Sequence, residues 1–487
     1  MKTEKVIFTN SQKKAFGLIQ DFLDSDDPVF ILKGYAGTGK TFLIAEIVKY
    51  LRMIKTEVYL AAPTGRAARI VAQKTNYDAR TIHSFIYSGV DEVGEDEEDF
   101  VWNFNTKRNR DSLDCVYIID ESSMISDSTA NEYFIKFGSG RVLKDLFTYT
   151  GIIGSSVEEG NNRKIIFVGD PAQLPPVNTT LSPALSPDHL YDNYGIESHE
   201  TEMRDVVRQS QESGILKNAT RIRECIREEE YDWLKMEEGY DVVNLELNGD
   251  AGGYFEEKLN NPDTLLITAT NRGALKYNKA VRNYLFENHR DEIQVGDRLL
   301  VVSNNYYYGL MNGDLATVMS IHTETEKIPV RLRNAQQELT LCFRDITLRL
   351  DGPKSELFDC KIVENLLNSP ERGLSTAEAA ALSICSRRQL DVPFPDKRLR
   401  RSNPSEFKKQ QREYFQKLKE SEYYNALQVK YGYALTCHKA QGGEWENVIV
   451  DFTSFHRKET EDYFRWVYTA ISRASGKLYL INPPGIR

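Results

Sequence analysis

The sequence predicts an α/β protein with two parallel-sheet domains, and three observations lead to this prediction. Four short apolar runs, with helical-looking segments between them, fill the first third of the chain at residues 29–32, 58–62, 116–119 and 165–168. A second set of such runs lies at residues 264–267, 448–450 and 478–481. The length of 487 residues exceeds what one hydrophobic core normally serves. Apolar runs that alternate with helices are typical of parallel, doubly wound sheets.

An insertion of more than a hundred residues interrupts the second set of runs and splits the second sheet domain in sequence. Between residues 291 and 350 apolar residues alternate with polar ones, and turn signals such as Asn312-Gly313-Asp314 appear. This pattern predicts a small β-barrel. Residues 376–427 look helical, with a Pro-containing basic interruption near residues 392–404.

The composition excludes several classes of protein. With 40% hydrophobic and 28% charged residues, the chain is expected to be globular rather than disordered. No stretch approaches the roughly 20 apolar residues of a membrane span, and residues 1–10 lack the layout of a signal peptide, so we expect a cytoplasmic protein. The six cysteines are scattered, without a Cys-x-x-Cys pair, which favours reduced thiols over a zinc site or disulfides.

The net charge of −10 by itself argues against a nucleic-acid partner, because Lys and Arg supply most non-specific affinity for phosphates. The distribution of charge weakens that argument. Residues 91–99 hold seven acids and no base, whereas residues 386–420 hold eleven Lys or Arg against five acids. An acidic total can therefore hide a basic track, although each run alone is at least as often ordinary solvated surface.

The strongest chemical signal is a phosphate-binding loop at residues 34–41, which read Gly-Tyr-Ala-Gly-Thr-Gly-Lys-Thr. It follows an apolar run and precedes a helical pattern, as such a loop requires. Gly34, Gly37, Thr38 and Gly39 let backbone N–H groups wrap the phosphates of a nucleotide. Lys40 offsets charge on the β and γ phosphates, and the Thr41 hydroxyl can ligate Mg²⁺.

Two later strand ends carry the partners that this loop needs. Asp120 and Glu121 follow the run at residues 116–119. Asp120 is placed to hold the metal through water, and Glu121 to orient or deprotonate the attacking water. Gln173 follows the run at residues 165–168 and can sense the γ-phosphate, while the surrounding prolines stiffen its loop.

Taken together, the ordered motifs resemble those of superfamily 1 helicases. The resemblance is closest to the 5′-to-3′ subclass that holds the RecD-like and Dda-like enzymes. The motifs occupy residues 34–41, 62–68, 81–84, 120–123, 169–175, 207–209, 436–444 and 468–474.

The resemblance implies two RecA-like domains with two insertions. The first RecA-like domain would occupy residues 1–85 and 115–200, and the second residues 201–290 and 429–487. A β-hairpin that splits the duplex would lie at residues 86–114. An SH3-like barrel with a basic helical extension would lie at residues 291–428.

The resemblance also implies roles for residues around the nucleotide. Gln12 matches the glutamine that reads adenine, and Gly442 and Glu444 match further nucleotide contacts. Arg208 and Arg473 match two arginines that reach the γ-phosphate from the second domain, where their charge would act as arginine fingers do. ATP and Mg²⁺ are the implied cofactors, and hydrolysis would require the two domains to close.

Strand contacts are implied on both sheet domains. Pro63, Thr64 and His83 of the first domain, with Thr436 and His438 of the second, match residues that hold the sugar-phosphate backbone. Trp102, in the implied hairpin, could stack on the end of a base pair. A plain packing role for Trp102 is about equally consistent with the sequence.

Two features depart from the family pattern. Gly65 and Arg66 have the RecD-like form of the motif at residues 62–68, so one DNA contact of the Dda-like enzymes does not transfer. Residues 133–162 are longer than the family pattern explains.

The sequence therefore indicates an ATP-dependent DNA helicase that moves 5′ to 3′ as a monomer on single-stranded DNA and at duplex junctions. An RNA-directed helicase stays open, because backbone contacts barely distinguish the sugars. A non-translocating, ATP-gated clamp or loader also stays open.

Overall fold

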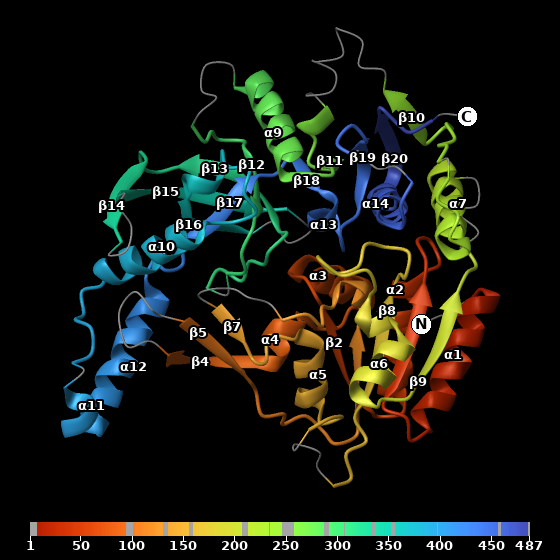
Figure 1. The fold of residues 1–487 in the computed structure, drawn as a ribbon, viewed down its shortest axis with the longest axis horizontal. Helices are drawn as coiled ribbons and strands as arrows, with labels where there is room; N and C mark the ends of the chain where they lie inside the picture. Colours follow the sequence, from red (N-terminus) through yellow and green to blue (C-terminus); the bar gives the residue numbers. More distant parts are fainter. Residues whose placement is uncertain are drawn as a thin grey trace, which may run out of the picture.

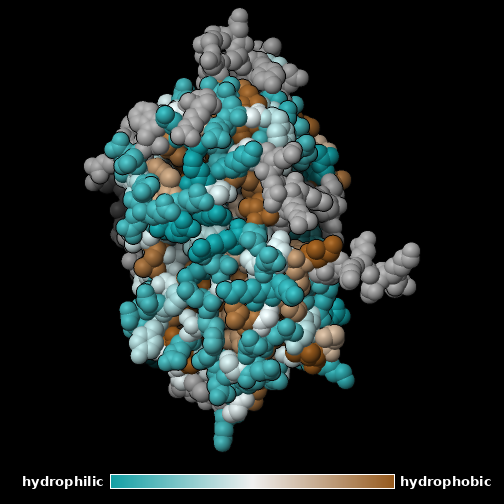
Figure 2. All heavy atoms as spheres, turned by 90° about the vertical axis from the view of Figure 1, so that its right-hand side faces the viewer, coloured by the Kyte–Doolittle hydropathy of each residue, from teal (hydrophilic) through white to brown (hydrophobic). Residues whose placement is uncertain are grey.

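The computed structural model describes residues 7–485 apart from the internal segments 94–100, 130–134, 155–158, 207–212, 233, 246–257, 287–291, 306, 333–337, 352–355, 397 and 456–458. Two parallel-sheet domains lie one above the other in Figure 1, with a β-rich unit and a small hairpin sheet beside them. Among the described residues, no helix has the length and apolar character needed to cross a membrane. On the face shown in Figure 2, hydrophilic side chains dominate and apolar ones are scattered.

The first parallel sheet has the strand order β3-β2-β6-β8-β1-β9. Its strands are β1 (Val29–Gly34), β2 (Glu57–Ala62), β3 (Ala79–Thr81), β6 (Cys115–Ile119), β8 (Lys164–Gly169) and β9 (Ser198–Met203). All of its neighbouring strands pair in parallel. The four predicted apolar runs are confirmed as β1, β2, β6 and β8, whereas the short β3 and the polar β9 lacked an apolar run.

Both faces of this sheet are buried, which explains why its strands are continuously apolar. Val29 and Ile31 of β1 pack into one core cluster, and the alternate residues Phe30 and Leu32 pack into another. One face carries α1 (Asn10–Leu23), α2 (Lys40–Met53) and α3 (Gly65–Thr75). The other carries α4 (Ile82–Ile86), α5 (Val142–Thr150) and α6 (Pro187–Tyr194).

A small second sheet projects from the first domain. Strands β4 (Tyr87–Val93) and β5 (Val101–Thr106) pair antiparallel, and β7 (Ile135–Phe137) joins β5 in parallel. The segment at 133–162, unexplained by its sequence, thus supplies β7 and helix α5. Buried Asp145 of α5 accepts hydrogen bonds from the Tyr87 hydroxyl (2.6 Å) and the Ser139 N–H (3.0 Å), which ties the base of the hairpin to the helix.

The second parallel sheet has the strand order β10-β20-β19-β11-β18. Its strands are β10 (Val242–Leu245), β11 (Thr264–Thr268), β18 (Ala434–Thr436), β19 (Trp445–Asp451) and β20 (Ala474–Ile481). The accompanying helices are α7 (Gly214–Glu228), α9 (Asn271–Leu285), α13 (Cys437–Ala440) and α14 (Glu461–Ile471). Segments on both sides of the insertion therefore join in one parallel sheet.

The insertion forms a β-rich unit whose pairings close into a ring, because β13 pairs with both β12 and β15. Its strands are β12 (Arg298–Val301), β13 (Leu315–Ile321), β14 (Glu326–Arg331), β15 (Glu338–Leu350), β16 (Leu357–Val363) and β17 (Leu427–Tyr431). Beyond it lie α10 (Thr376–Arg388), α11 (Leu399–Ser402) and α12 (Pro404–Glu420), as the helical pattern predicts. Single 3₁₀ turns are η1 (Ser122–Met124), η2 (Pro183–Leu185) and η4 (Glu364–Leu366). We call this ring of strands the barrel.

Two strands cross the domain boundaries expected from the sequence. Strand β9 pairs with β1 as far as Met203, so the first sheet extends past residue 200. Strand β17 pairs with β12 and β16, so the barrel extends to Tyr431 rather than ending at residue 428. Both strands are added by chain segments distant in sequence from their neighbours, which local patterns do not reveal.

Candidate nucleotide site and strand-binding surface

The phosphate loop, residues 34–41, runs from the end of β1 into the first turn of α2. Gly37 and Gly39 have φ angles of +76° and +77°, which side chains of L-residues rarely adopt. A Cβ atom at Gly34 would lie 2.8 Å from Cγ of Lys40, so that glycine makes room for the lysine side chain. The loop therefore requires glycine at each of these three positions.

Lys40 lies along the inside of this loop. Its Nζ donates to the carbonyl oxygens of Gly34 (2.6 Å) and Tyr35 (3.1 Å) and lies 3.9 Å from Oδ2 of Asp170. The hydroxyl of buried Thr38 also donates to the Tyr35 carbonyl, at 2.8 Å. Thr41 sits partly exposed in the first turn of α2. The lysine ammonium is thus held where a phosphate chain wrapped by the loop would lie.

Gln12 joins α1 to the phosphate loop. Its Oε1 accepts from the backbone N–H of Thr9 (3.0 Å), which completes a capping box at the start of α1. Its Nε2 donates to the carbonyl of Thr38 at 3.0 Å. The structure thus brings this buried side chain against the loop, as its predicted role requires.

Asp120 and Glu121 follow β6 at the same edge of the sheet. Burial, and then the charge of Glu121, raise the pKa of Asp120 to about 7, while Lys40 opposes this shift. Glu121 has a left-handed φ of +51°, which is costly for a residue with a side chain. Its Oε2 atom is buried and has no hydrogen-bond partner among the described residues. A strained backbone that holds an unpaired carboxylate oxygen is typical of a functional site.

Two further buried oxygens at this edge also lack partners in the described part of the chain, Oγ of Ser123 and Oε1 of Gln173. Gln173 belongs to the Asp170 loop, residues 170–175, which follows β8. Asp170 is fully buried and accepts from the N–H of Ala172 at 3.0 Å. Carboxylate, amide and hydroxyl oxygens are the ligands that Mg²⁺, its bound waters and a water nucleophile require. The donor set therefore fits a magnesium–nucleotide complex.

The second domain contacts this site through Tyr468 of α14. The Tyr468 hydroxyl accepts from the N–H of Ala36 in the phosphate loop (2.9 Å) and donates to Oδ2 of Asp170 (2.7 Å). Burial raises the pKa of this tyrosine far above its ordinary value, so it stays a neutral donor. One side chain of the second domain thereby joins two loops of the first.

Neighbouring side chains fix the rest of the Asp170 loop to the second domain. The Leu174 N–H donates to the Thr469 hydroxyl (2.9 Å), and the Leu174 carbonyl accepts from Nε2 of Gln441 (2.9 Å). Arg465 donates to the carbonyls of Pro171 and Gln173. Since Ala172 and Leu174 also enter the hydrophobic core of the second domain, the nucleotide edge of one sheet is bonded directly to the other domain.

Comparison with known proteins supports this arrangement at both ends of the chain. A family model described as an AAA domain matches residues 20–179, and one described as a UvrD-like helicase C-terminal domain matches residues 431–481. The ATP-dependent DNA helicase dda of Enterobacteria phage T4 is 26% identical over 305 residues, 60% of this chain and 60% of that protein. These matches make the chain similar to the Dda and Pif1 helicases over the segments that they cover.

The matches to two other relatives cover a smaller share of those proteins. An uncharacterized protein of Methanocaldococcus jannaschii is 26% identical over 484 residues, 93% of this chain but 36% of that protein. The ATP-dependent DNA helicase Pif1 of a Psychrobacter species is 33% identical over 162 residues, 33% of this chain and 21% of the Pif1 protein. The chain thus spans about a third of the first of these relatives and a fifth of the second.

Of the two arginines predicted to reach the γ-phosphate, only Arg473 lies among the described residues. Arg473 is buried and donates to the carbonyls of Thr469 (3.0 Å) and Gly443 (3.2 Å), so its described contacts lie within the second domain. Arg208 lies outside the described residues.

Gly442 and Glu444 instead reach the first domain. A Cβ atom at Gly442, where φ is +71°, would lie 3.1 Å from Cβ of Ala67 and 3.4 Å from Oγ1 of Thr64. Exposed Glu444 pairs with Lys74 of α3 at 3.4 Å. The loop after α13 therefore packs against the start of α3.

The predicted strand contacts occupy helix starts on both domains. Thr64 caps α3 by accepting from the Ala67 N–H (3.2 Å), with Pro63 just before it. Thr436 caps α13, and its hydroxyl makes no capping hydrogen bond. His438 is exposed, and burial of part of its ring lowers its pKa.

His83 and Trp102 belong to the region of the hairpin. The His83 ring packs edge-on against Phe137 at 5.0 Å, and burial lowers its pKa. Trp102 falls in β5, but its side chain lies outside the described residues. The structure therefore adds a packing role for His83 to the predicted strand contact.

Sequence reasoning missed the residues that join the domains. Tyr468 and Thr469 lie in the same motif as Arg473, yet only the arginine carried an evident chemical signal. The bonding groups of Gln441 and Arg465 are common on helix and loop surfaces. Their partners lie about 270 to 300 residues away in the chain, so no local pattern could reveal them.

Proposed function

We propose that the protein is an ATP-dependent DNA helicase that translocates 5′ to 3′ on single-stranded DNA and unwinds duplex in replication, recombination or repair. One observation carries the proposal. The phosphate loop and the Asp170 loop of the first domain are both bonded to Tyr468 of the second. A movement of either loop on nucleotide binding would therefore also alter the contacts between the two domains. The names of the Dda and Pif1 relatives support the same activity.

The residues at the phosphate loop would bind ATP and position its hydrolysis. Backbone N–H groups from Gly37 to Thr41 would wrap the β-phosphate, and Lys40 would leave its loop carbonyls to contact the γ-phosphate. Thr41 and, through water, Asp120 would hold Mg²⁺, which when bound neutralises phosphate charge. Oε2 of Glu121, which has no hydrogen-bond partner among the described residues, would orient and deprotonate a water molecule.

Closure of the domains would complete this site. Gln173 would sense the γ-phosphate, and Arg208 and Arg473 would stabilise charge that develops on it. Because Arg473 follows Tyr468 by five residues, a movement of α14 on the phosphate loop would also move this arginine. Gln12, Gly442 and Glu444 would contact the rest of the nucleotide.

The strand would cross both domains, with Pro63, Thr64 and His83 on the first and Thr436 and His438 on the second. We assign the hairpin at residues 86–114, with Trp102, to separation of the duplex. Helix α12 lies near this hairpin (Figure 1). It supports the position of the hairpin, because Phe104 of β5 packs against Tyr414 and Leu418. We assign the barrel to an SH3-like domain that covers the exit of the strand, and we expect a monomer to suffice.

ATP turnover with and without a single strand tests this function. We expect DNA to stimulate turnover by the wild-type protein. Lys40→Ala is expected to abolish turnover and leave strand binding largely intact, because Lys40 contacts phosphate and the strand surfaces lie elsewhere. Lys49→Ala, an exposed lysine on the same helix, is the matched control.

The other outcomes separate the alternatives. Substantial turnover by Lys40→Ala would refute the assigned nucleotide site. Stimulation by RNA alone would indicate an RNA-directed helicase. Strand binding that responds to ATP, without strand-stimulated turnover, would indicate a clamp or loader.

A further inference from the structure

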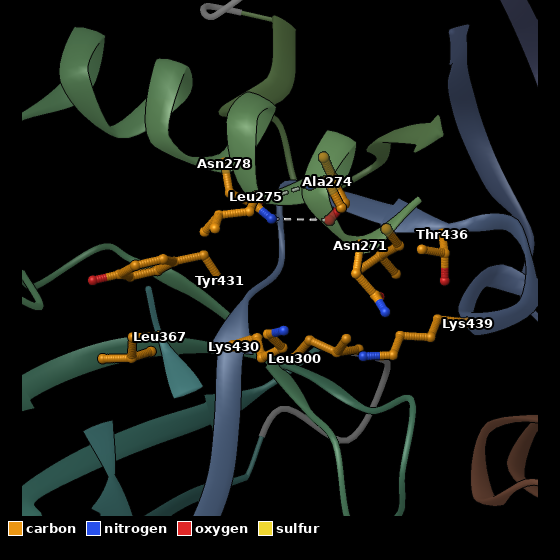
Figure 3. A pocket seen from close by; sticks show the side chains of 12 residues that line it. Asn271, Ala274, Leu275, Asn278, Leu300, Leu367, Lys430, Tyr431, Thr436 and Lys439 are labelled. Atoms are coloured by element: carbon orange, nitrogen blue, oxygen red, sulfur yellow. Dashed lines mark hydrogen bonds between the residues drawn. The ribbon is translucent and has the colours of Figure 1, made fainter. Parts of the chain in front are cut away.

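The barrel and the second domain adjoin each other around a pocket (Figure 3). Lys430 of β17 lines it from the barrel, and Lys439 of α13 lines it from the second domain. Strand β18 and the first turns of α9 complete its wall on the second domain. The barrel is thus placed against the strands and helices of the second domain.

The start of helix α3 meets both of these units. A Cβ atom at Gly65 would lie 2.0 Å from Cβ of Met311 in the barrel. A Cβ atom at Gly442 of the second domain would lie 3.1 Å from Cβ of Ala67. Figure 1 shows α3 on the side of the first domain that faces the second. Arg66, between Gly65 and Ala67, therefore stands at the junction of the three units.

The Arg66 side chain reaches from the first domain to a tryptophan of the second. Its guanidinium carbon lies 3.9 Å from the centroid of the Trp445 ring, which is a close cation–π stack. A Cβ atom at Gly443 would lie 2.5 Å from the Trp445 ring and 2.9 Å from Nε of Arg66. Gly443 therefore leaves the space that both groups of the stack occupy.

The stack is a contact without hydrogen bonds. A guanidinium group has five N–H donors, but Arg66 forms neither a hydrogen bond nor an ion pair with any residue that the structure describes. Burial, and then the charge of Arg298, lower the pKa of Arg66 to about 10, so the side chain stays charged at neutral pH. The stack with Trp445 therefore takes the place of the hydrogen bonds that usually hold an arginine.

Trp445 is bonded in turn to Arg473. The backbone N–H of Trp445 donates to the Arg473 carbonyl at 2.9 Å. The Arg473 guanidinium donates to the carbonyl of Gly443, two residues before Trp445, at 3.2 Å. The Ser475 hydroxyl donates to the Trp445 carbonyl at 3.1 Å. A displacement of Trp445 would therefore displace both the backbone and the side chain of Arg473.

On its other side, Arg66 belongs to the helix turn that carries an assigned strand contact. Thr64 caps α3 and lies two residues before Arg66. A strand held at Thr64 would therefore act on the first turn of α3 and, through Arg66, on Trp445. These contacts form one contiguous path from the strand side of the first domain to Arg473.

We propose that Arg66 is a positioning residue, which through its stack on Trp445 sets Arg473 in place for ATP hydrolysis when a strand occupies the start of α3. This inference rests on the proposed function and gives it a route by which a strand stimulates ATP turnover. The role differs from that of a strand contact, because loss of Arg66 would lower the turnover of protein that is saturated with strand.

Steady-state ATP turnover by the whole chain, with and without saturating oligodeoxythymidine, tests the proposal. The measured quantity is the ratio of kcat with strand to kcat without it, which does not depend on the concentration of active protein. We expect Arg66→Gln to lower this ratio about 5- to 10-fold, because the cation–π contact is lost. The KM for ATP should change less than about twofold, since the residues assigned to ground-state nucleotide binding stay in place. Arg66→Lys, which keeps a cation at the ring, should recover part of the ratio.

Arg52→Gln is the matched control. Exposed Arg52 lies 5.7 Å from the centroid of the Tyr77 ring, and both residues belong to the first domain. Its loss should leave the ratio unchanged. A double-mutant cycle with Trp445→Leu tests whether Arg66 acts through Trp445. Arg66→Gln should lower the ratio in the wild type and lower it no further in the Trp445→Leu background.

Thermal unfolding midpoints check that the variants fold. A folded Arg66→Gln protein with the wild-type ratio would overturn the proposal. An equal fall of the ratio in both Trp445 backgrounds would also overturn it, because Arg66 would then act through another group. If a higher strand concentration restores the ratio of Arg66→Gln, the residue is a strand contact and the positioning role is wrong. A wild-type protein whose ATP turnover no strand stimulates would instead refute the proposed function itself.

Discussion

At the scale of single residues, Tyr468 has the contacts of a positioning residue. Among the described residues it forms no hydrogen bond with Lys40 or Gln173, the groups that would bind the γ-phosphate, yet its hydroxyl bonds to the loops that carry them. Because the hydroxyl is fully buried, its loss leaves a buried N–H and a buried carboxylate oxygen unpaired.

Tyr468→Phe is therefore expected to lower stability by about 1–3 kcal/mol. We expect it to lower strand-stimulated kcat about tenfold, which corresponds to about 1.4 kcal/mol, with a smaller change in the KM for ATP. Chemical unfolding and steady-state turnover measure the two effects. A fall in stability with an unchanged kcat would reduce Tyr468 to a structural role.

Tyr463 provides the matched control on the same helix. It is fully buried, but its hydroxyl has no hydrogen-bond partner in the described chain. Tyr463→Phe should therefore leave turnover unchanged, because no bond is lost.

The sequence predicted those site residues that belong to a short motif. Lys40, Asp120 and Gln173 each follow an apolar run, and the parallel strands bring the ends of those runs to one edge. Lys430 and Lys439 become a pair only because β17 closes the barrel beside the second sheet. Such a cluster depends on the docking of two units and has no signature in sequence spacing.

At the scale of elements, the barrel is docked on the first domain through α3. A Cβ atom at Gly65, the first residue of α3, would lie 2.0 Å from Cβ of Met311. Arg69 of the same helix pairs with buried Asp314 at 2.7 Å and donates to the Gly309 carbonyl at 3.0 Å. The turn of the barrel between β12 and β13 therefore touches the helix that Thr64 caps.

Gly65→Ala is expected to destabilise the protein by about 1–3 kcal/mol, because Met311 must move to admit the new methyl group. In a Met311→Gly background the same change should cost much less, which a double-mutant cycle of unfolding free energies measures. Additive costs in the two backgrounds would show that the two residues do not meet.

The sequence predicts a strand where it contains a continuous apolar run. Strand β9, with Ser198 and Glu200, carries no such run and was recognised only through its pairing with β1. Strand β17 follows directly after a long helical segment, so its start at Leu427 was assigned to helix. Strand β7 adds to β5 from a segment that the family pattern did not explain. In each case pairing with a distant strand overrides the local pattern.

At the scale of the whole molecule, two parallel-sheet domains meet over the nucleotide edge of the first. The barrel touches both domains. Its Met311 packs against Gly65 of α3, and its Lys430 lines a pocket together with Lys439 of the second domain. Nucleotide-driven movement of one sheet domain against the other would therefore be transmitted to the barrel and to the strand held beside it.

Unwinding of matched DNA duplexes with a 5′ or a 3′ single-stranded tail tests this account most directly. The account predicts ATP-dependent opening of the 5′-tailed duplex only, and none by Lys40→Ala. Opening of the 3′-tailed duplex alone would contradict the direction of movement. Strand-stimulated ATP turnover that opens neither duplex would contradict the helicase activity itself.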